Sequence, residues 1–184
     1  MAVELDGKAW RTVPDGVVVR CSLSADVVLD RPLARSLARE LRSERALGTA
    51  VRSLRARPMS EQRLRERLQS RGVRPDAEEA AVGTLTEAGF VDDGRLARGR
   101  AVALAERGWG NAAIEARLMR EGLRAPDVEA AVTELERETD RAGALVAGLP
   151  PRKAWSLLQR RGFEVETIES VLGDLDGSGV EGLG

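Results

Sequence analysis

One pattern of residues occurs three times along the chain and constrains its fold more than any other feature. Each copy holds an apolar residue, a helix-starting residue, two apolar residues one turn apart, a glycine and a final apolar residue. The copies are Met59-Ser60-Leu64-Leu68-Gly72-Val73, Trp109-Gly110-Ile114-Leu118-Gly122-Leu123 and Leu149-Pro150-Ala154-Leu158-Gly162-Phe163. The helix-starting residue is typical of an N-cap, and the apolar residues on either side of it are placed to form a hydrophobic staple. The glycine is typical of a helix end in the left-handed conformation. The chain is therefore predicted to consist of helical repeats.

A second helix is predicted after each of these glycines, because apolar residues follow at positions i, i+3, i+4 and i+7. The stripes are Val128, Ala131, Val132, Leu135 in the second copy and Ile168, Val171, Leu172, Leu175 in the third. In the first copy the stripe reads Glu78, Ala81, Val82, Leu85, with one polar member. The glycines lie 50 and then 40 residues apart, a spacing typical of helical repeat arrays.

The predicted fold class is all-α, with tandem three-helix repeats in an elongated array and a small N-terminal β-ribbon extension. A shortened last repeat is typical of a terminal cap, and a tail without periodicity is expected to be flexible. The expected organisation is a β-rich extension at 1–31, helical repeat 1 at 32–92, repeat 2 at 93–138, a short capping repeat 3 at 139–176 and a flexible tail at 177–184.

The first thirty residues contain three short β-rich runs, VEL, AWRTV and GVVVRCSL, separated by Asp6-Gly7 and Asp15-Gly16. Such dipeptides are turn signals, so a ribbon of two or three strands is predicted. The ribbon needs a covering partner, and we expect Trp10, Val17, Val19 and Cys21 to pack on the first long helix. Cys21 is the only cysteine and is interpreted as a small packed apolar residue.

That first long helix is predicted from Arg31-Pro32 to Arg57 and ends before Pro58. Its apolar residues form one stripe of Leu33, Leu37 and Leu41 and another of Leu47, Val51 and Leu54. The phase slips between the stripes, which predicts a bend or a change of packing partner. Further on, Asp92 is predicted to cap a helix that runs to about Arg107, with Val91 and Leu96 as its staple.

Several kinds of chemistry are excluded by composition. The chain has no histidine and one cysteine, so Ser-His and Cys-His mechanisms and zinc sites of the Cys/His type are excluded. Neither of the glycine motifs that bind phosphate is present, and Asp92-Asp93 is explained as a helix start. We expect no enzymatic activity, no metal and no cofactor. No apolar run is long enough to span a bilayer and no signal peptide is recognisable, so a cytoplasmic protein is expected.

Charge is unevenly distributed along the chain although its net value is −1. Residues 31–75 hold 13 arginines and four glutamates, a net charge of +9, whereas residues 76–150 hold nine arginines and 15 acidic residues, a net charge of −6. Arginine as an ordinary polar surface residue is one interpretation, and docking on a polyanionic partner is the other. Arg65 is offset by Glu61 at i, i+4. The basic surface predicted to bind a partner comprises Arg55, Arg57, Arg63, Arg67, Arg71 and Arg74.

Three segments of this chain resemble the RecX regulatory proteins, bacterial modulators of the RecA recombinase. They are LRARPMSEQRLRERLQSRG, GFVDDGRLARGRA and RGWGNAAIEARLMREG, and the resemblance covers roughly residues 44–137. Leu96 stands where the family often has phenylalanine, an exchange that a core tolerates. The matching positions are structural, namely Ser60, Leu64, Leu68, Gly72, Asp92 and Gly110, so the predicted contact residues rest on charge alone.

The resemblance implies a monomer that lies in the helical groove of a RecA filament on single-stranded DNA and bridges neighbouring subunits. It would inhibit ATP turnover and strand exchange, with weak direct contact to DNA as a further option. One alternative is a stand-alone nucleic-acid-binding helical protein, which the near-zero net charge and the lack of aromatic residues in the basic block disfavour. A peptide-binding scaffold of the helical-repeat type is the other.

Overall fold

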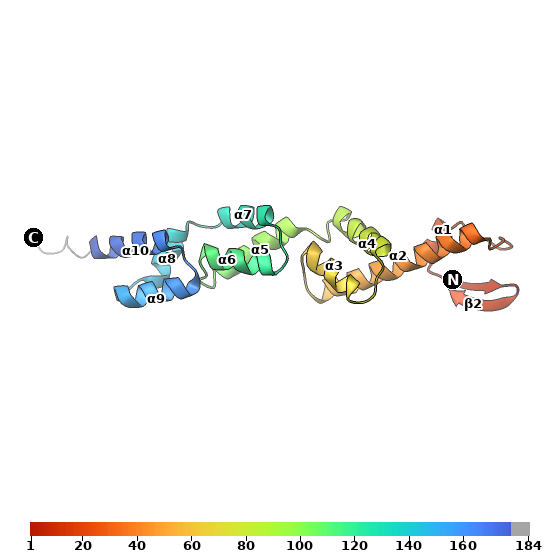
Figure 1. The fold of residues 1–184 in the computed structure, drawn as a ribbon, viewed down its shortest axis with the longest axis horizontal. Helices are drawn as coiled ribbons and strands as arrows, with labels where there is room; N and C mark the ends of the chain where they lie inside the picture. Colours follow the sequence, from red (N-terminus) through yellow and green to blue (C-terminus); the bar gives the residue numbers. More distant parts are fainter. Residues whose placement is uncertain (178–184) are drawn as a thin grey trace, which may run out of the picture. The chain divides into compact units, whose positions relative to one another are not determined.

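A computed structural model describes the backbone of residues 1–177 and the side chains of residues 1–173. Residues 178–184 of the predicted flexible tail and the side chain of Leu175 lie outside the described residues, whereas Gly177 belongs to the last helix. The chain forms two compact units, Met1–Val91 and a second that begins at Asp92. The first unit contains β1 (Ala2–Leu5), β2 (Lys8–Thr12), α1 (Asp15–Arg20), α2 (Arg31–Ala56), α3 (Glu61–Gln69) and α4 (Pro75–Glu87) (Figure 1). The second contains α5 (Asp93–Ala105), α6 (Asn111–Arg120), α7 (Ala125–Thr133), α8 (Glu138–Val146), α9 (Pro151–Arg161) and α10 (Val165–Gly177). The predicted all-α class with a small N-terminal sheet is confirmed.

The long helix α2 is the spine of the first unit. Asp30 caps it by accepting a hydrogen bond from the Leu33 amide at 2.8 Å. The amino-terminal half packs Leu37 and Leu41 against α1, while the carboxy-terminal half packs Ala46 and Ala50 against α3 and α4 (Figure 1). The predicted change of packing partner along α2 is therefore confirmed. The predicted burial of Val51 is wrong, because its side chain is 36% exposed and Ser53 is buried in its place.

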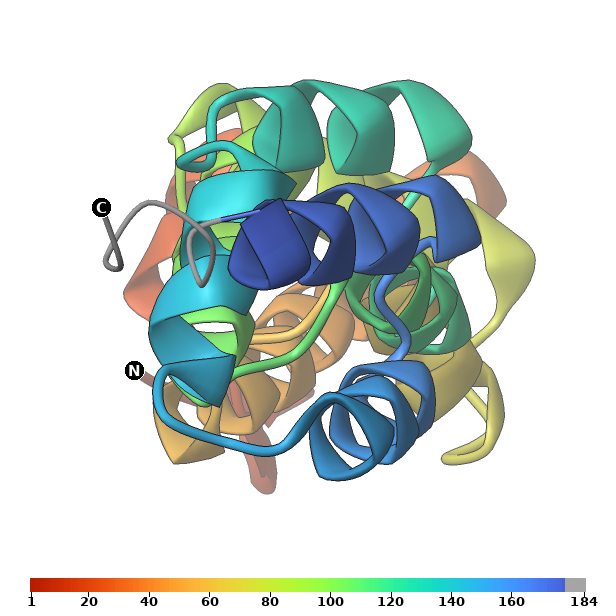
Figure 2. The same cartoon turned by 90° about the vertical axis from the view of Figure 1, so that its left-hand side faces the viewer.

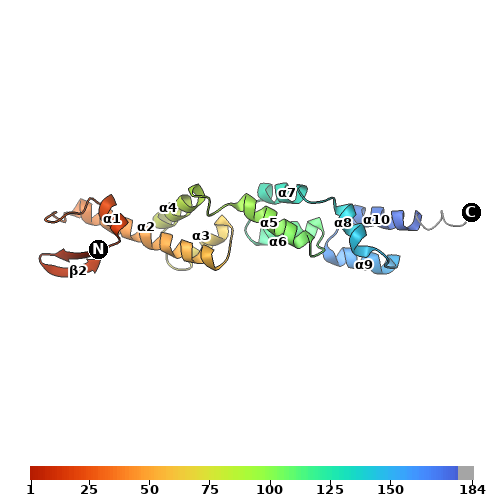
Figure 3. The ribbon, with the colours of Figure 1, turned by 180° about the vertical axis from the view of Figure 1, so that it is seen from behind.

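The N-terminal ribbon has two strands. β1 and β2 pair antiparallel, with Leu5 opposite Lys8, and Asp6 and Gly7 both adopt positive φ in the turn, as the sequence predicts. The hairpin lies beside the amino-terminal part of α2, where Val3 packs against the cluster that contains Leu37 (Figure 3). Trp10 is 39% exposed and lies outside that cluster, so its predicted packing on the long helix is wrong.

The predicted third strand is also wrong, because residues Asp15–Arg20 form helix α1. Pro14 at the N-cap and Asp15 in the first turn favour a helix start, and they outweigh the β-preference of the valines. The buried residues Val13, Val17 and Cys21 recur at intervals of four, as on a helix. Val19, which strand alternation would bury, is 76% exposed. The predicted contact of Val17 and Cys21 with the long helix is nevertheless confirmed.

All three glycines of the repeated pattern end helices in the left-handed conformation. Gly72, Gly122 and Gly162 have φ of +71°, +79° and +73°. The apolar residue after each glycine donates its amide to the carbonyl of the second residue of the apolar pair, which closes the Schellman motif. These hydrogen bonds run from Val73 to Leu68 at 3.1 Å, from Leu123 to Leu118 at 3.3 Å and from Phe163 to Leu158 at 3.1 Å. The predicted helix ends are confirmed.

The same closure also occurs at helix ends that the sequence reasoning missed. Gly89 has φ of +71° and the Phe90 amide donates to the Leu85 carbonyl at 2.8 Å. Gly108 has φ of +75° and the Trp109 amide donates to the Leu104 carbonyl at 3.2 Å. The apolar-glycine-apolar ending therefore terminates α4 and α5 as well as α3, α6 and α9.

Side-chain caps begin α3 and α5 as predicted. Ser60 Oγ accepts from the Arg63 amide at 3.3 Å, and Asp92 Oδ1 accepts from the Arg95 amide at 2.8 Å. The staple predicted at α5 is wrong. Val91 is buried in the cluster of α2, α3 and α4, whereas Leu96 packs against the core of α5, α6 and α7.

Two groups of three helices make up the second unit. α5, α6 and α7 surround Ile114 and Leu118, and α8, α9 and α10 surround Val146, Leu158 and Phe163 (Figure 2). The stripes predicted after Gly122 and Gly162 are buried or packed against these cores over the described side chains. That the helix groups are three separate repeats, with the last as a cap, stays a prediction.

The two groups touch where the start of α6 meets the end of α9. The Gly110 amide donates to the Arg161 carbonyl at 2.9 Å, and a Cβ on Gly110 would lie 2.3 Å from the Gly162 carbonyl oxygen. A Cβ on Gly162 would lie 2.4 Å from that of Ala113. The close approach of the two backbones therefore leaves no room for a side chain at Gly110 or Gly162. Gly162 also has the positive φ that ends α9.

A buried carboxylate also joins the two helix groups. Glu138, at the start of α8, accepts from the Asn111 amide of α6, from Thr167 Oγ1 of α10 at 2.7 Å and from the Glu164 amide at 3.4 Å. Arg141 donates to the Trp109 carbonyl at 2.9 Å and to Asn111 Oδ1. Burial lowers the pKa of the Arg141 guanidinium, and the nearby Glu138 opposes that effect.

Glu138→Ala is expected to lower the free energy of unfolding by about 2 kcal/mol, because it leaves buried donors without an acceptor. Chemical unfolding followed by circular dichroism measures this loss. Glu129→Ala is the control, since Glu129 is exposed on α7 and its replacement should change stability by less than about 0.5 kcal/mol. Equal stability of the two variants would show that the Glu138 hydrogen bonds do not hold the groups together.

Candidate functional site

The six arginines of the predicted basic surface all lie in the first unit, and all are exposed. Leu64 and Leu68 are fully buried on the inner side of α3, which leaves Arg63 and Arg67 one turn apart on an outer flank. The remaining four flank α3 in the chain. Arg55 lies in the last turn of α2, Arg57 is its C-cap, Arg71 follows α3 and Arg74 is the N-cap of α4.

Ion pairing divides the basic surface into two classes. Arg63 Nη1 lies 2.7 Å from Glu66 Oε2, and Arg74 Nε lies 3.4 Å from Asp76 Oδ1. Among the residues whose side chains are described, no carboxylate lies within ion-pair distance of the guanidinium groups of the other four arginines, Arg55, Arg57, Arg67 and Arg71. The charges of these four are therefore not offset by a described carboxylate.

The ion pair of Arg63 with Glu66 is favoured by a lowered pKa of the Glu66 carboxyl. A hydrogen bond from Gln62 Nε2 at 3.1 Å, followed by that from Arg63, lowers the pKa of the Glu66 carboxyl. Folding lowers the pKa of this carboxyl, so its contribution to stability is fully present above the pKa that it has in the unfolded chain. That contribution is lost as the pH falls through the pKa that it has in the folded protein. Glu66 therefore stays charged beside Arg63 at neutral pH.

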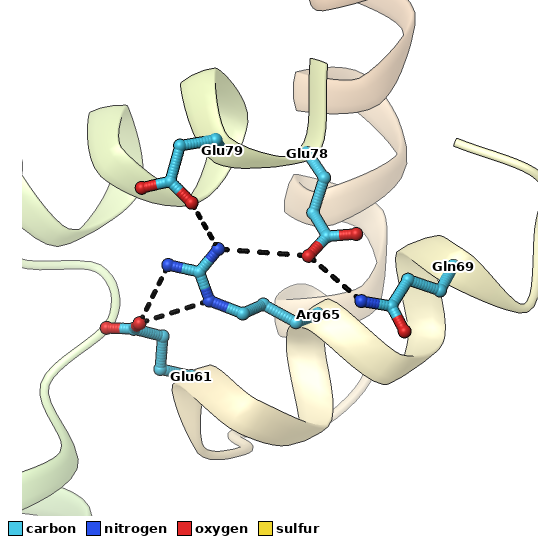
Figure 4. Close-up of polar contacts among 5 residues, drawn as sticks. All are labelled: Glu61, Arg65, Gln69, Glu78 and Glu79. Atoms are coloured by element: carbon cyan, nitrogen blue, oxygen red, sulfur yellow. Dashed lines mark hydrogen bonds and ion pairs between the residues drawn. The ribbon is translucent and has the colours of Figure 1, made fainter. Parts of the chain in front are cut away.

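Arg65 is held in a cluster that fastens α3 to α4 (Figure 4). The guanidinium nitrogens of Arg65 lie 2.9 Å from Glu61 Oε1, 2.6 Å from Glu79 Oε2 and 3.8 Å from Glu78 Oε1. The side chain of Glu78 is buried, and its Oε1 also accepts a hydrogen bond from Gln69 Nε2 at 3.2 Å. The hydrogen bond to Glu79 is the main cause of the raised pKa of Arg65. The predicted pair of Arg65 with Glu61 is confirmed, and the cluster joins α3 to α4.

Acidic residues of α4 lie against the arginines that precede them in the chain. Asp76 is 3.8 Å from Arg42 of α2, and Glu78 and Glu79 contact Arg65 of α3. The sequence places these acids in the negative segment that begins at residue 76, so the contrast of +9 and −6 overstates the separation of charge in space. Arg42 and Arg65, which these acids offset, are not members of the predicted basic surface.

A second basic site, which the sequence reasoning missed, lies in the second unit. A pocket of about 340 Å³ is lined by Arg100, Arg107, Arg117, Arg120, Ala103, Leu104 and Glu121, and we call it the arginine pocket. The net charge of −6 for residues 76–150 concealed it. A usable signal exists nevertheless, because Arg117 and Arg120 are one turn apart on α6 and the other two arginines are two turns apart on and after α5.

Metal and membrane sites do not emerge from residues 1–173. No group of three or more acidic or cysteine side chains in that part of the chain could hold a metal ion. The helices of the described residues do not combine the length and the apolar character that crossing a bilayer requires.

No model of a protein family matches this sequence. Individual relatives are found, and they carry one name. The regulatory protein RecX of Xanthomonas axonopodis pv. citri is 38% identical over 138 residues, which cover 69% of this chain and 83% of that protein. The regulatory protein RecX of Stenotrophomonas maltophilia is 37% identical over 136 residues, which cover 68% of this chain and 81% of the relative.

Solved structures share the fold. The crystal structure of a regulatory protein RecX matches with a TM-score of 0.80 at 18% identity, covering 94% of each chain. The crystal structure of RecX from Lactobacillus salivarius matches with a TM-score of 0.68 at 15% identity, covering 73% of this chain and 97% of the other. The identity and coverage of the sequence relatives show that this chain belongs to the RecX family of regulatory proteins.

Proposed function

We propose that this protein binds the RecA recombinase filament on single-stranded DNA and inhibits its ATPase and strand-exchange activities. Membership of the RecX family carries the proposal, because this family is expected to modulate RecA. The protein would act as a cytoplasmic monomer that lies in the filament groove, in recombination and DNA repair.

The chemistry of the first unit supports a partner that presents many negative charges. Four of the six arginines on the basic surface, those at positions 55, 57, 67 and 71, are exposed and have no carboxylate partner among the described side chains. Guanidinium groups that are not satisfied internally can form charge-assisted hydrogen bonds to carboxylates or phosphates. A filament repeats such groups along its groove, so individually modest contacts add up.

Three sites that contain carboxylates have structural roles, which supports a binding protein rather than an enzyme. Asp92 caps α5, Glu138 joins two helix groups and the Arg65 cluster fastens α3 to α4. With no histidine in the chain, these carboxylates lack the usual partner for acid–base catalysis.

Titration of the purified protein into a RecA ATPase assay with single-stranded DNA tests the proposal. The rate of ATP hydrolysis is expected to fall as the protein approaches and exceeds the concentration of RecA. A rate that stays unchanged at several-fold molar excess would contradict the proposed function. A pull-down from bacterial lysate, with and without nuclease, identifies the partner, because a protein that binds nucleic acid alone loses it after nuclease treatment.

A further inference from the structure

The arginine pocket brings the side chains of four arginines together in the second unit. Its lining contains one carboxylate, Glu121, whose Oε2 lies 3.3 Å from Arg100 Nε. Four guanidinium groups and one carboxylate give the lining a net charge of +3. Like charges that line one pocket repel one another, and a bound anion would relieve the repulsion.

Neighbouring groups fix the backbone and side chains of the pocket. The Arg117 guanidinium lies 3.8 Å from the ring centre of Trp109, a cation–π contact. Arg120 Nε donates to the Ala116 carbonyl at 3.0 Å. The Arg107 carbonyl accepts from Arg161 at 2.8 Å, while no described carboxylate lies within ion-pair distance of the Arg107 guanidinium. The site is thus preorganised, with at least one arginine that is not committed to an internal ion pair.

Size and shape indicate the kind of anion. A volume of about 340 Å³ lies in the lower part of the range of small-molecule sites, which is roughly 300–1,000 Å³. Forked guanidinium donors match the oxygens of a phosphate. Ala103 and Leu104 add an apolar surface to the lining, on which a sugar or base attached to the phosphate can pack.

We propose that the arginine pocket binds the phosphate of a nucleotide, either free or as one unit of a single-stranded nucleic acid. Arg107 donates to the phosphate oxygens, and Arg117, held on the ring of Trp109, supplies a second guanidinium beside it. The site lies outside the basic surface of the first unit. It goes beyond the proposed function because it requires no recombinase.

Binding of a fluorescein-labelled oligothymidylate to the purified full-length protein, measured by anisotropy without RecA, tests this site. Arg107→Gln is expected to weaken binding about tenfold. It should also lower the dependence of log K on log salt by about 0.7, the value for one phosphate contact on a single strand. Arg152→Gln is the matched control, because Arg152 is exposed on α9, outside the pocket, and forms no ion pair with a described residue.

Competition with ATP distinguishes the two sources of the phosphate. Displacement of the strand by ATP, lost in Arg107→Gln, would assign the pocket to free nucleotides as well as strands. If ATP does not displace the strand but Arg107→Gln weakens binding of the strand, the pocket would be assigned to the nucleic-acid backbone. Equal binding of the strand by Arg107→Gln and Arg152→Gln, or no binding of strand or ATP by the wild type, would overturn the proposal. A failure here leaves the RecA ATPase assay unaffected, so the two proposals are tested separately.

Discussion

Gly110→Ala is expected to lower the free energy of unfolding by roughly 3 kcal/mol, at the upper end of overpacking effects. The backbone of Gly110 has φ of −78°, which alanine adopts freely, so the cost is purely steric. The added Cβ would lie 2.3 Å from both the Gly162 carbonyl oxygen and the Phe163 amide nitrogen. These are backbone atoms that cannot rotate away. The start of α6 and the end of α9 would have to separate, which breaks the hydrogen bond from the Gly110 amide to the Arg161 carbonyl.

Urea unfolding followed by tryptophan fluorescence and circular dichroism measures this loss. Gly99→Ala is the matched control, because Gly99 lies inside α5 and a Cβ there meets nothing within 4 Å. That variant should be stabilised by about 0.5–1 kcal/mol, since glycine in a helix costs conformational entropy. Gly72→Ala should lower the free energy of unfolding by about 1 kcal/mol, because Gly72 has a positive φ that strains alanine, although a Cβ there would meet no other atom within 4 Å. Wild-type stability of Gly110→Ala would contradict the close approach of α6 and α9.

The helix ends were predictable from the sequence because their causes are local. A serine or aspartate cap, a glycine with positive φ and an apolar residue after it act within six residues of one another. Ser60, Asp92 and Gly72 therefore appear in the structure where the sequence places them. Gly108 was missed although it follows the same rule, because its apolar partner Leu104 was not recognised as part of a stripe.

Helix α1 was mispredicted because two local signals conflict. The run Gly16 to Leu23 is rich in β-branched residues, and strand alternation would bury Val17, Val19 and Cys21. The structure buries Val17 and Cys21 and leaves Val19 exposed, since α2 offers one face to pack against. Tertiary packing decided between helix and strand, and the sequence of the segment alone does not contain that information.

The candidate sites were harder to predict than the fold, because charge pairing acts between segments that are distant in the chain. Arg63 and Arg65 each lie three or four residues from a glutamate with which they pair, and Arg65 also contacts Glu79 of α4. The arginine pocket likewise depends on the packing of α5 on α6. The net charge of a chain segment therefore indicates neither the pairing of Arg65 nor the arginine pocket. The contact of Gly110 with Gly162 was hidden for the same reason, since 52 residues separate them.

Reversal of charge on α3, in the variant Arg63→Glu/Arg67→Glu, is expected to abolish binding to the RecA filament while leaving the fold intact. Each reversal should cost about tenfold in affinity, because it replaces attraction to a polyanionic surface with repulsion. Arg63 already interacts with Glu66, so Arg67→Glu alone is the cleaner probe of a contact. Both side chains are exposed on a flank of α3 beside the buried Leu64 and Leu68, and replacing them should not disturb the core.

Filament binding across a salt series, with circular dichroism as the folding control, measures this effect. The difference between wild type and double variant should grow as salt is lowered, because screening weakens the attraction that only the wild type retains. Arg35→Glu/Arg39→Glu is the matched control, since these arginines are also exposed, four residues apart on one helix of the first unit and without a described ion pair. An equal loss in the control would indicate a response to net charge alone. Equal binding at low salt by a folded Arg63→Glu/Arg67→Glu protein would remove both arginines from the contact surface and make them ordinary solvated residues of α3.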